Sequence, residues 1–133
     1  MTPARDVGST RPLLDKLGVK SGARVVLLGV DDAEFRRLLA ERTDDVHAQL
    51  VAGADLVVFA ATSKADLKPL ADLKLHLKSN GAIWVVRPKG VPGGLSEPGI
   101  IEAALAAGLV DNKVVSFSAT HSALRLVIPL HLR

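Results

Sequence analysis

Four basic side chains lie just after predicted strands or at the tip of a predicted hairpin: Lys64, Arg87, Lys89 and His121. Ligands of open α/β sheets bind beyond the carboxyl ends of the strands, so these side chains are expected at one edge. Arginine can hold a carboxylate or phosphate through two hydrogen bonds, and lysine adds a point charge. The residues therefore predict a site for a small anionic ligand. Asp31 and Asp32 belong to the same edge and oppose an anion, and helix caps with solvated loop ends are the alternative interpretation.

Other chemistries lack the residues or the spacing that they require. The chain has no cysteine, which excludes disulfides, thiolate catalysis and cysteine-based zinc sites. Its four histidines have no metal-ligand spacing, and no Gly-x-Ser-x-Gly elbow supports a triad of Ser63, His121 and Asp32. The loop at residues 89–94 lacks the Gly-Lys-Ser/Thr ending of a Walker loop, so a flexible connection is favoured over phosphate binding there. We therefore assign no catalytic residue and no metal ligand.

Apolar runs predict the strands that would position the basic residues. Five runs are expected to form one sheet: Val25–Leu28, Leu56–Ala60, Ile83–Val86, Val114–Ser118 and Leu124–Ile128. The last two are joined tightly, which predicts an antiparallel hairpin. The segment Val46–Val51 suits either a short edge strand or a loop. The pattern predicts an α/β fold, a single Rossmann-like domain of three layers with a mostly parallel central sheet.

Capping residues mark helices between these strands. Helices are expected over residues 13–17, from Asp31 to near Thr43, from Ser63 to Asn80–Gly81, and over about 97–107. In this interpretation Asp31 is an N-cap, with Glu34 completing a capping box, and Ser96 caps the last helix. Pro69 is expected to kink or restart the third helix, because proline removes a helical hydrogen bond.

Length and composition indicate one domain, residues 10–133, after a frayed tail at residues 1–9. No window approaches the ~18 apolar residues of a membrane helix, so no membrane association is expected. Residues 1–6 lack the apolar core of a secretory signal, which places the protein in the cytoplasm. The oligomeric state is not indicated.

Nucleic acid is not an expected partner. The net charge of +3 is small, and the aromatic side chains lie in apolar patterns rather than on a base-stacking surface. Four lysines would form a basic stripe on a straight helix: Lys64, Lys68, Lys74 and Lys78. Pro69 disturbs their phase, so a solvated face is favoured. Weak nucleic-acid binding stays an alternative, and its mark would be a strong dependence on salt.

Four segments stand out against known folds: Leu17–Val25, Asp55–Phe59, Gly81–Pro88 and Ala106–Val110. Through them the chain resembles the class I methyltransferase fold with a shortened first half. The chain is similar, more closely, to a group of short bacterial proteins of unknown function through the segments Gly108–Val114 and Ser122–Ile128. This resemblance implies a methyltransferase-like fold and no particular activity.

The resemblance also implies where S-adenosylmethionine would bind. Active class I methyltransferases carry an acid inside the first strand and a Gly-x-Gly turn after it, and Leu27 and Asp31 stand at the positions of the acid and the second glycine. Asp31 would fill that space and place a negative charge beside the cofactor's carboxylate. The acid that should follow the second strand and hold the ribose hydroxyls has no counterpart, since too few residues separate Gly29 from Asp55 for the usual two βα units. We therefore expect no cofactor and a non-catalytic or functionally drifted domain that binds a small anion or another protein. An active S-adenosylmethionine-dependent methyltransferase is the alternative.

Overall fold

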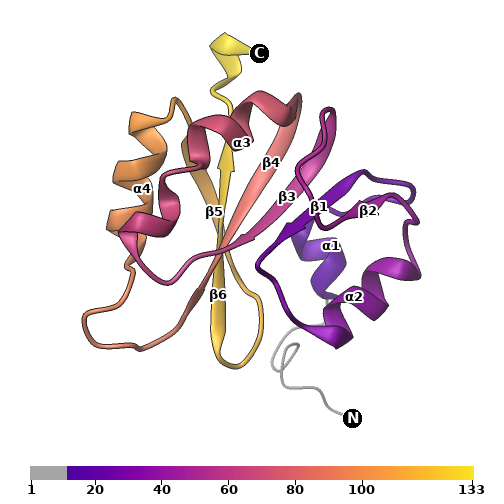
Figure 1. Cartoon of the computed structure of the whole chain (residues 1–133), viewed down its shortest axis with the longest axis horizontal. Helices are drawn as coiled ribbons and strands as arrows, with labels where there is room; N and C mark the ends of the chain where they lie inside the picture. Colours follow the sequence, from indigo (N-terminus) through magenta and orange to yellow (C-terminus); the bar gives the residue numbers. More distant parts are fainter. Residues whose placement is uncertain (1–11) are drawn as a thin grey trace.

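A computed structural model describes residues 12–133, which form a sheet of six strands in the order β2-β1-β3-β4-β6-β5 (Figure 1). The first four of these pair in parallel, and β6 runs antiparallel to both β4 and β5. The strands are β1 (Val25–Leu28), β2 (Val46–His47), β3 (Ala54–Ala60), β4 (Leu77–Pro88), β5 (Val110–Ser116) and β6 (His121–Val127). The predicted α/β fold with its antiparallel closing hairpin is confirmed. Of the two alternatives left open for Val46–Val51, the edge strand is present over its first two residues as β2. The predicted tail at residues 1–9 lies outside the described residues.

Helices cover both faces of the sheet, as expected for right-handed parallel connections (Figure 1). In the described part of the chain they are α1 (Leu13–Leu17), α2 (Ala33–Ala40), the 3₁₀ helix η2 (Lys64–Leu67), α3 (Leu70–His76), α4 (Glu97–Ala106) and the 3₁₀ helix η3 (Leu130–Leu132). Apolar side chains of α1 and α2 pack on one face of the sheet, and those of η2, α3 and α4 pack on the other. The result is the predicted three-layer arrangement.

The core on the α1–α2 face is centred on Trp84 of β4, which is fully buried. Its indole N–H donates a hydrogen bond to the carbonyl oxygen of Leu17 at 3.0 Å, which joins the central strand to the end of α1. On the same face, the rings of Phe35 and Phe117 meet edge to face with centroids 4.9 Å apart. The Phe35–Phe117 contact joins α2 to the residues that lead into the β5–β6 turn. The aromatic residues are therefore core residues, as the sequence predicts.

Both strands of the closing hairpin begin earlier than predicted, β5 at Val110 and β6 at His121. Two other local signals differ from the expectation. The N-cap of α2 is Asp32 and not Asp31, because the Asp32 carboxylate accepts the backbone N–H of Phe35 at 2.9 Å. The helix expected to end at Asn80–Gly81 ends at His76, and β4 already begins at Leu77. Both predictions are wrong by a small shift along the chain. The second shift matters more, since it converts a predicted helix end into a strand.

Other cap signals are confirmed. Ser96 accepts the backbone N–H of Gly99 at 3.2 Å at the start of α4, and Gly108 ends that helix region with φ of 81°. Pro69 restarts the chain as a helix after η2, as predicted. Hydrogen bonds from the backbone N–H and hydroxyl of Thr62 hold the pKa of Asp66 below its usual value, so a charged carboxylate caps the start of η2. No helix in residues 12–133 has the length and apolar character needed to span a bilayer.

Candidate functional site

A small cavity of about 200 Å³ opens at the carboxyl ends of the parallel strands, and we call it the carboxyl-edge pocket. It lies between the ends of β1, β3 and β4, the start of α2 and the β5–β6 turn. Its lining consists of Gly29, Val30, Asp31, Asp32, Ala60, Val86, Phe117, Ser118, Thr120 and His121. This is the edge at which open α/β sheets bind their ligands.

Gly29 shapes the floor of the carboxyl-edge pocket. It follows β1 with φ of 74°, a conformation that glycine adopts without strain and that turns the chain towards α2. A Cβ at this position would meet the Cβ of Ala60 at 3.5 Å, so the ends of β1 and β3 lie in close contact. Asp31 follows two residues later and is exposed at the pocket. The carboxylate of Asp31 therefore lies at the mouth of the turn that follows β1.

The polar groups of the pocket come mainly from the β5–β6 turn. The hydroxyl of Ser118 accepts the backbone N–H groups of Thr120 at 3.2 Å and His121 at 3.1 Å, which fixes the turn. Nδ1 of His121 lies 2.8 Å from the hydroxyl oxygen of Thr120. A hydroxyl beside an imidazole resembles a nucleophile with its base, but no carboxylate of residues 12–133 contacts the other ring nitrogen of His121 to orient it. The arrangement is suited to hydrogen bonding with a ligand.

Two of the four predicted anion-binding residues lie against α4. The guanidinium of Arg87 is 3.9 Å from the carboxylate of Glu97 and donates to the backbone carbonyl of Leu95 at 3.4 Å. The ammonium group of Lys64 is 3.5 Å from the carboxylate of Glu102. Both cations therefore already have acidic neighbours on the same helix.

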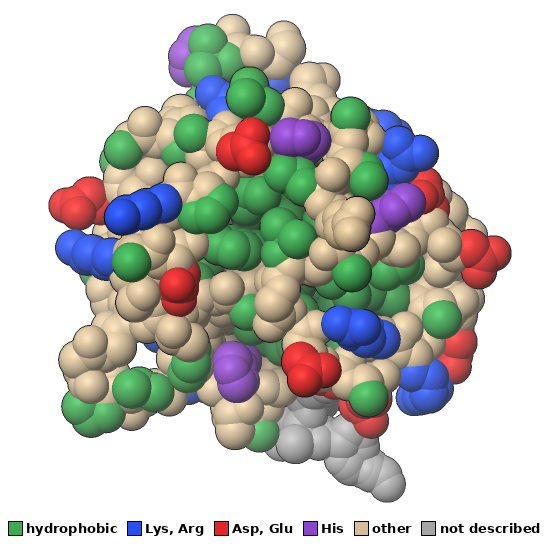
Figure 2. Space-filling model, viewed as in Figure 1, with side chains coloured by type: hydrophobic (Ala, Val, Ile, Leu, Met, Phe, Trp, Pro, Cys, Tyr) green, Lys and Arg blue, Asp and Glu red, His purple; other side chains and the backbone are tan. Residues whose placement is uncertain are grey.

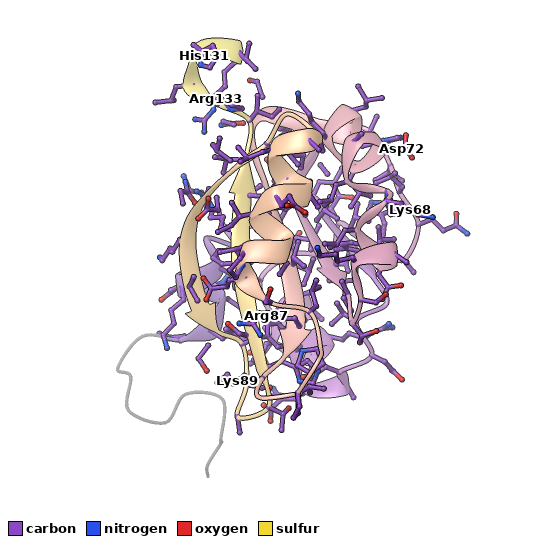
Figure 3. The ribbon with its side chains drawn as sticks, turned by 90° about the vertical axis from the view of Figure 1, so that its left-hand side faces the viewer. Lys68, Asp72, Arg87, Lys89, His131 and Arg133 are labelled. Carbon is purple, nitrogen blue, oxygen red and sulfur yellow. The ribbon has the colours of Figure 1, made fainter. Side chains whose placement is uncertain are left out.

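The other two predicted residues meet at the β5–β6 turn. Lys89 donates to the hydroxyl of Ser116 at 2.8 Å and to the carbonyl of Ser118 at 2.9 Å. His121 contacts the same Ser118 through its backbone N–H. Figure 3 shows Arg87 and Lys89 at one end of the molecule, but Arg87 faces α4 whereas His121 lines the carboxyl-edge pocket. An anion site formed by all four residues stays a prediction.

Side-chain alternation explains why the predicted residues are divided between two faces. Val86 of β4 packs in the α1–α2 core and lines the pocket, so the next side chain, Arg87, must point to the opposite face. The sequence predicts where β4 ends but not which face of the sheet Arg87 points to. The same alternation identifies Val86 and Ala60 as lining residues. Ser118 has no signal beyond its place at the end of a predicted strand.

The residues of this edge do not fit S-adenosylmethionine well. No acidic residue follows β2 before Asp55, so the carboxylate that holds the ribose hydroxyls is missing. Asp55 itself lies at the other edge, where it accepts the backbone N–H of Arg24 at 2.8 Å and pairs with Lys78 at 3.0 Å. A cavity of about 200 Å³ is also below the roughly 300–1,000 Å³ of ordinary ligand pockets. In residues 12–133 no group of three His, Cys, Asp or Glu side chains gathers to hold a metal.

The four lysines that would form a basic stripe on a straight helix are spread over several elements. Lys64 is in η2, Lys68 follows it, Lys74 is in α3 and Lys78 is in β4. On the face of the molecule that Figure 2 shows, basic, acidic and histidine side chains are scattered around apolar ones, and they form no continuous basic surface there. The stripe expected for a straight helix is therefore not formed.

Comparison with known proteins places these observations in a family. The model of the DUF3052 family, described as a protein of unknown function, matches residues 14–130. No curated protein matches the chain significantly. The family model covers almost the whole of the described structure.

Solved structures with the same fold include several methyltransferases. A TehB-like S-adenosylmethionine-dependent methyltransferase from Corynebacterium glutamicum matches with a TM-score of 0.66 and 15% identity over 88% of this chain and 85% of its own. An S-adenosylmethionine-dependent methyltransferase from Aquifex aeolicus matches with a TM-score of 0.61 and 16% identity, and the match covers 88% of each chain. A chain of the complex between the Haloferax volcanii Trm112 methyltransferase activator and a methyltransferase matches with a TM-score of 0.66 and 13% identity. That match covers 90% of this chain and 88% of the other. Some other neighbours are longer, and the chain spans 47% of one of them. At these identities the likeness shows the methyltransferase-like fold alone.

Proposed function

Because the chain belongs to the DUF3052 family of proteins of unknown function and has a methyltransferase-like fold, we propose that it is a non-catalytic binding domain that does not use S-adenosylmethionine. The observation that carries this proposal is Asp31, which lines the carboxyl-edge pocket in place of the second glycine of the cofactor turn. A carboxylate here repels the carboxylate of the cofactor and occupies the space that its methionine end needs.

The rest of the carboxyl-edge pocket supports the same conclusion. Asp31 and Asp32 give it two carboxylates against the single imidazole of His121, and Ser118 and Thr120 add hydroxyl groups. This lining favours a small polar molecule with hydrogen-bond donors or a positive charge. The missing acid after β2 removes the contact that selects a nucleoside ribose.

We expect S-adenosylmethionine and S-adenosylhomocysteine to leave the melting temperature of the wild-type protein unchanged. A ligand present at 100 times its dissociation constant would add about 2.7 kcal/mol of stability, which a thermal-shift measurement detects easily. Asp31→Gly is the matched variant, since it restores the open turn and removes the negative charge. It should bind the cofactor no worse than the wild type. A clear shift in the wild-type protein would favour the active methyltransferase instead.

A second candidate is anion binding at the same edge through Arg87 and Lys89, together with Lys64 and His121. It is favoured by the position of Arg87 and Lys89 at one end of the sheet (Figure 3). The planar guanidinium would anchor a carboxylate or phosphate, but the anion must compete with Glu97 at 3.9 Å.

For this candidate, phosphate, pyrophosphate, nucleotides and dicarboxylates should stabilise the wild type and lose most of that effect in Arg87→Ala/Lys89→Ala. The measurement is the shift in melting temperature across an anion series. Arg37→Ala/Lys68→Ala removes the same charge from α2 and from the residue after η2, and Figure 3 shows the side chain of Lys68 pointing outward. It should respond like the wild type. Equal responses in all three proteins would show that these basic groups are only solvated loop ends.

A further inference from the structure

We propose a second ligand site at the opposite, amino-terminal edge of the sheet, where Arg125 binds the acidic group of an organic anion with an aliphatic body. Two adjoining cavities of about 400 and 510 Å³ open there and share Asn80 and Arg125 in their lining. We call them together the amino-edge groove. Each cavity has the size of an ordinary ligand pocket and exceeds the carboxyl-edge pocket.

The amino-edge groove runs between elements that are far apart in sequence. One cavity lies between the α1–β1 loop, at Lys20 and Ser21, and the amino-terminal part of β4. The other lies between β5, β6 and η3. Figure 3 shows Arg133, which lines the second cavity, at the end of the molecule opposite to Arg87 and Lys89. The groove is therefore separate from the carboxyl-edge pocket.

Arg125 lacks the acidic partner that Arg24, Arg42 and Arg87 have. Its guanidinium makes a single long hydrogen bond, 3.4 Å to the side-chain oxygen of Asn112, and no carboxylate of residues 12–133 lies within 4.0 Å of it. By contrast, Arg24 is 3.0 Å from Asp45. Most of the hydrogen-bonding capacity of Arg125 is thus open to a ligand in the groove.

The charge of Arg125 is also disfavoured by its surroundings. It projects from the central part of β6, opposite Trp84 of β4, and partial burial there lowers its pKa. Arg133 adds repulsion between two positive groups and lowers the pKa further. A guanidinium stays charged at neutral pH, so an anion that contacts it would offset both costs. Carboxylates and phosphates are the anions whose geometry matches the guanidinium.

The walls of the groove indicate what such an anion carries. Val110, Val127, Pro129 and Leu130 line the cavity beside Arg125, and Leu130 is 77% exposed. An aliphatic body laid on these side chains would remove apolar surface from water. No aromatic side chain of residues 12–133 lines either cavity, so stacking of a nucleobase is not favoured.

The test is a titration followed by two-dimensional ¹H–¹⁵N NMR, with octanoate and octyl phosphate as probes. Acetate and inorganic phosphate carry the same charged groups without the aliphatic body. We expect the octyl compounds to shift the amide signals of Asn80, Arg125 and Val127 at concentrations at which acetate and phosphate do not. Arg125→Met keeps an unbranched apolar stem but removes the guanidinium and its charge, and it should weaken binding at least tenfold. Arg37→Met removes an exposed arginine from α2 and should leave the affinity unchanged.

Arg125→Lys is the second variant, and it keeps a positive charge in the sheet if Arg125→Met fails to fold. Loss of the guanidinium fork should still weaken octanoate binding several-fold. The proposal is overturned if the folded Arg125 variants bind octanoate as the wild type does, or if the shifts appear at Gly29 and Thr120 instead. If inorganic phosphate and octyl phosphate bound equally well, the claim that the groove holds an aliphatic body would be overturned.

Discussion

Replacing Trp84 by alanine is expected to lower the free energy of unfolding by roughly 3–5 kcal/mol. The side chain is fully buried in the middle of β4, so its removal leaves a large cavity between the sheet and α1. The carbonyl of Leu17, itself buried, also loses the indole N–H that it accepts at 3.0 Å. Since domains of this size are stable by roughly 5–15 kcal/mol, the variant should be close to unfolding.

The measurement is urea denaturation followed by circular dichroism, because Trp84 is the single tryptophan and its variants lose the fluorescence signal. The free energy of unfolding of Trp84→Phe should fall between those of the wild type and Trp84→Ala, because phenylalanine keeps an aromatic ring but lacks the indole N–H donor. Leu75→Ala is the matched control, since Leu75 is 79% exposed and its truncation should cost less than about 0.5 kcal/mol. A loss of under about 1 kcal/mol in Trp84→Ala would contradict the central role assigned to this side chain.

The fold was predictable where burial alone decides the structure. Val25–Leu28 is the same segment in the sequence prediction and in the sheet, because four consecutive apolar residues suit a strand covered on both faces. The same argument gave the central parts of β3 and β4. The placement of helices on both faces of the sheet follows from the right-handed crossovers between these strands.

The first part of β4 could not be predicted in this way. Residues 78–80 are polar and exposed, so they show neither strand alternation nor a buried run. They fall between two paired positions, since Leu77 pairs with Ala54 and Ala82 pairs with Leu56, and the register shifts between these pairs. Such a shift depends on tertiary contacts, and a helix end at Asn80–Gly81 was the natural local interpretation.

The candidate sites show the same division between edge and face. The rule for α/β sheets located the carboxyl edge, and Asp31 and His121 do line the pocket there. Arg125 has no sequence signal of a site, because it stands inside a predicted strand, where a single charged residue usually points to solvent. Only the structure shows that it lines two cavities and that no carboxylate of residues 12–133 lies within 4.0 Å of its guanidinium.

Gly81→Ala is expected to destabilise the protein by about 2–3 kcal/mol, although it adds a single methyl group. A Cβ at this position would lie 2.9 Å from the carbonyl oxygen of Ala54, 3.0 Å from that of Asp55 and 3.1 Å from that of Lys78. All three are backbone atoms, so no side chain can rotate away to relieve the contact. The methyl group must instead separate β3 from β4 where their register shifts.

The matched control is Gly99→Ala, the same chemical change in the first turn of α4. There the added Cβ meets only side-chain atoms, the nearest being those of Lys64 and Ser96 at 3.4 Å. Alanine has a higher helix propensity than glycine by up to about 1 kcal/mol, so this variant should be neutral or more stable. The two variants therefore differ in sign, and thermal denaturation separates them. If Gly81→Ala melted at or above the wild-type temperature, the close approach of β3 and β4 at Gly81 could not be as tight as these distances require.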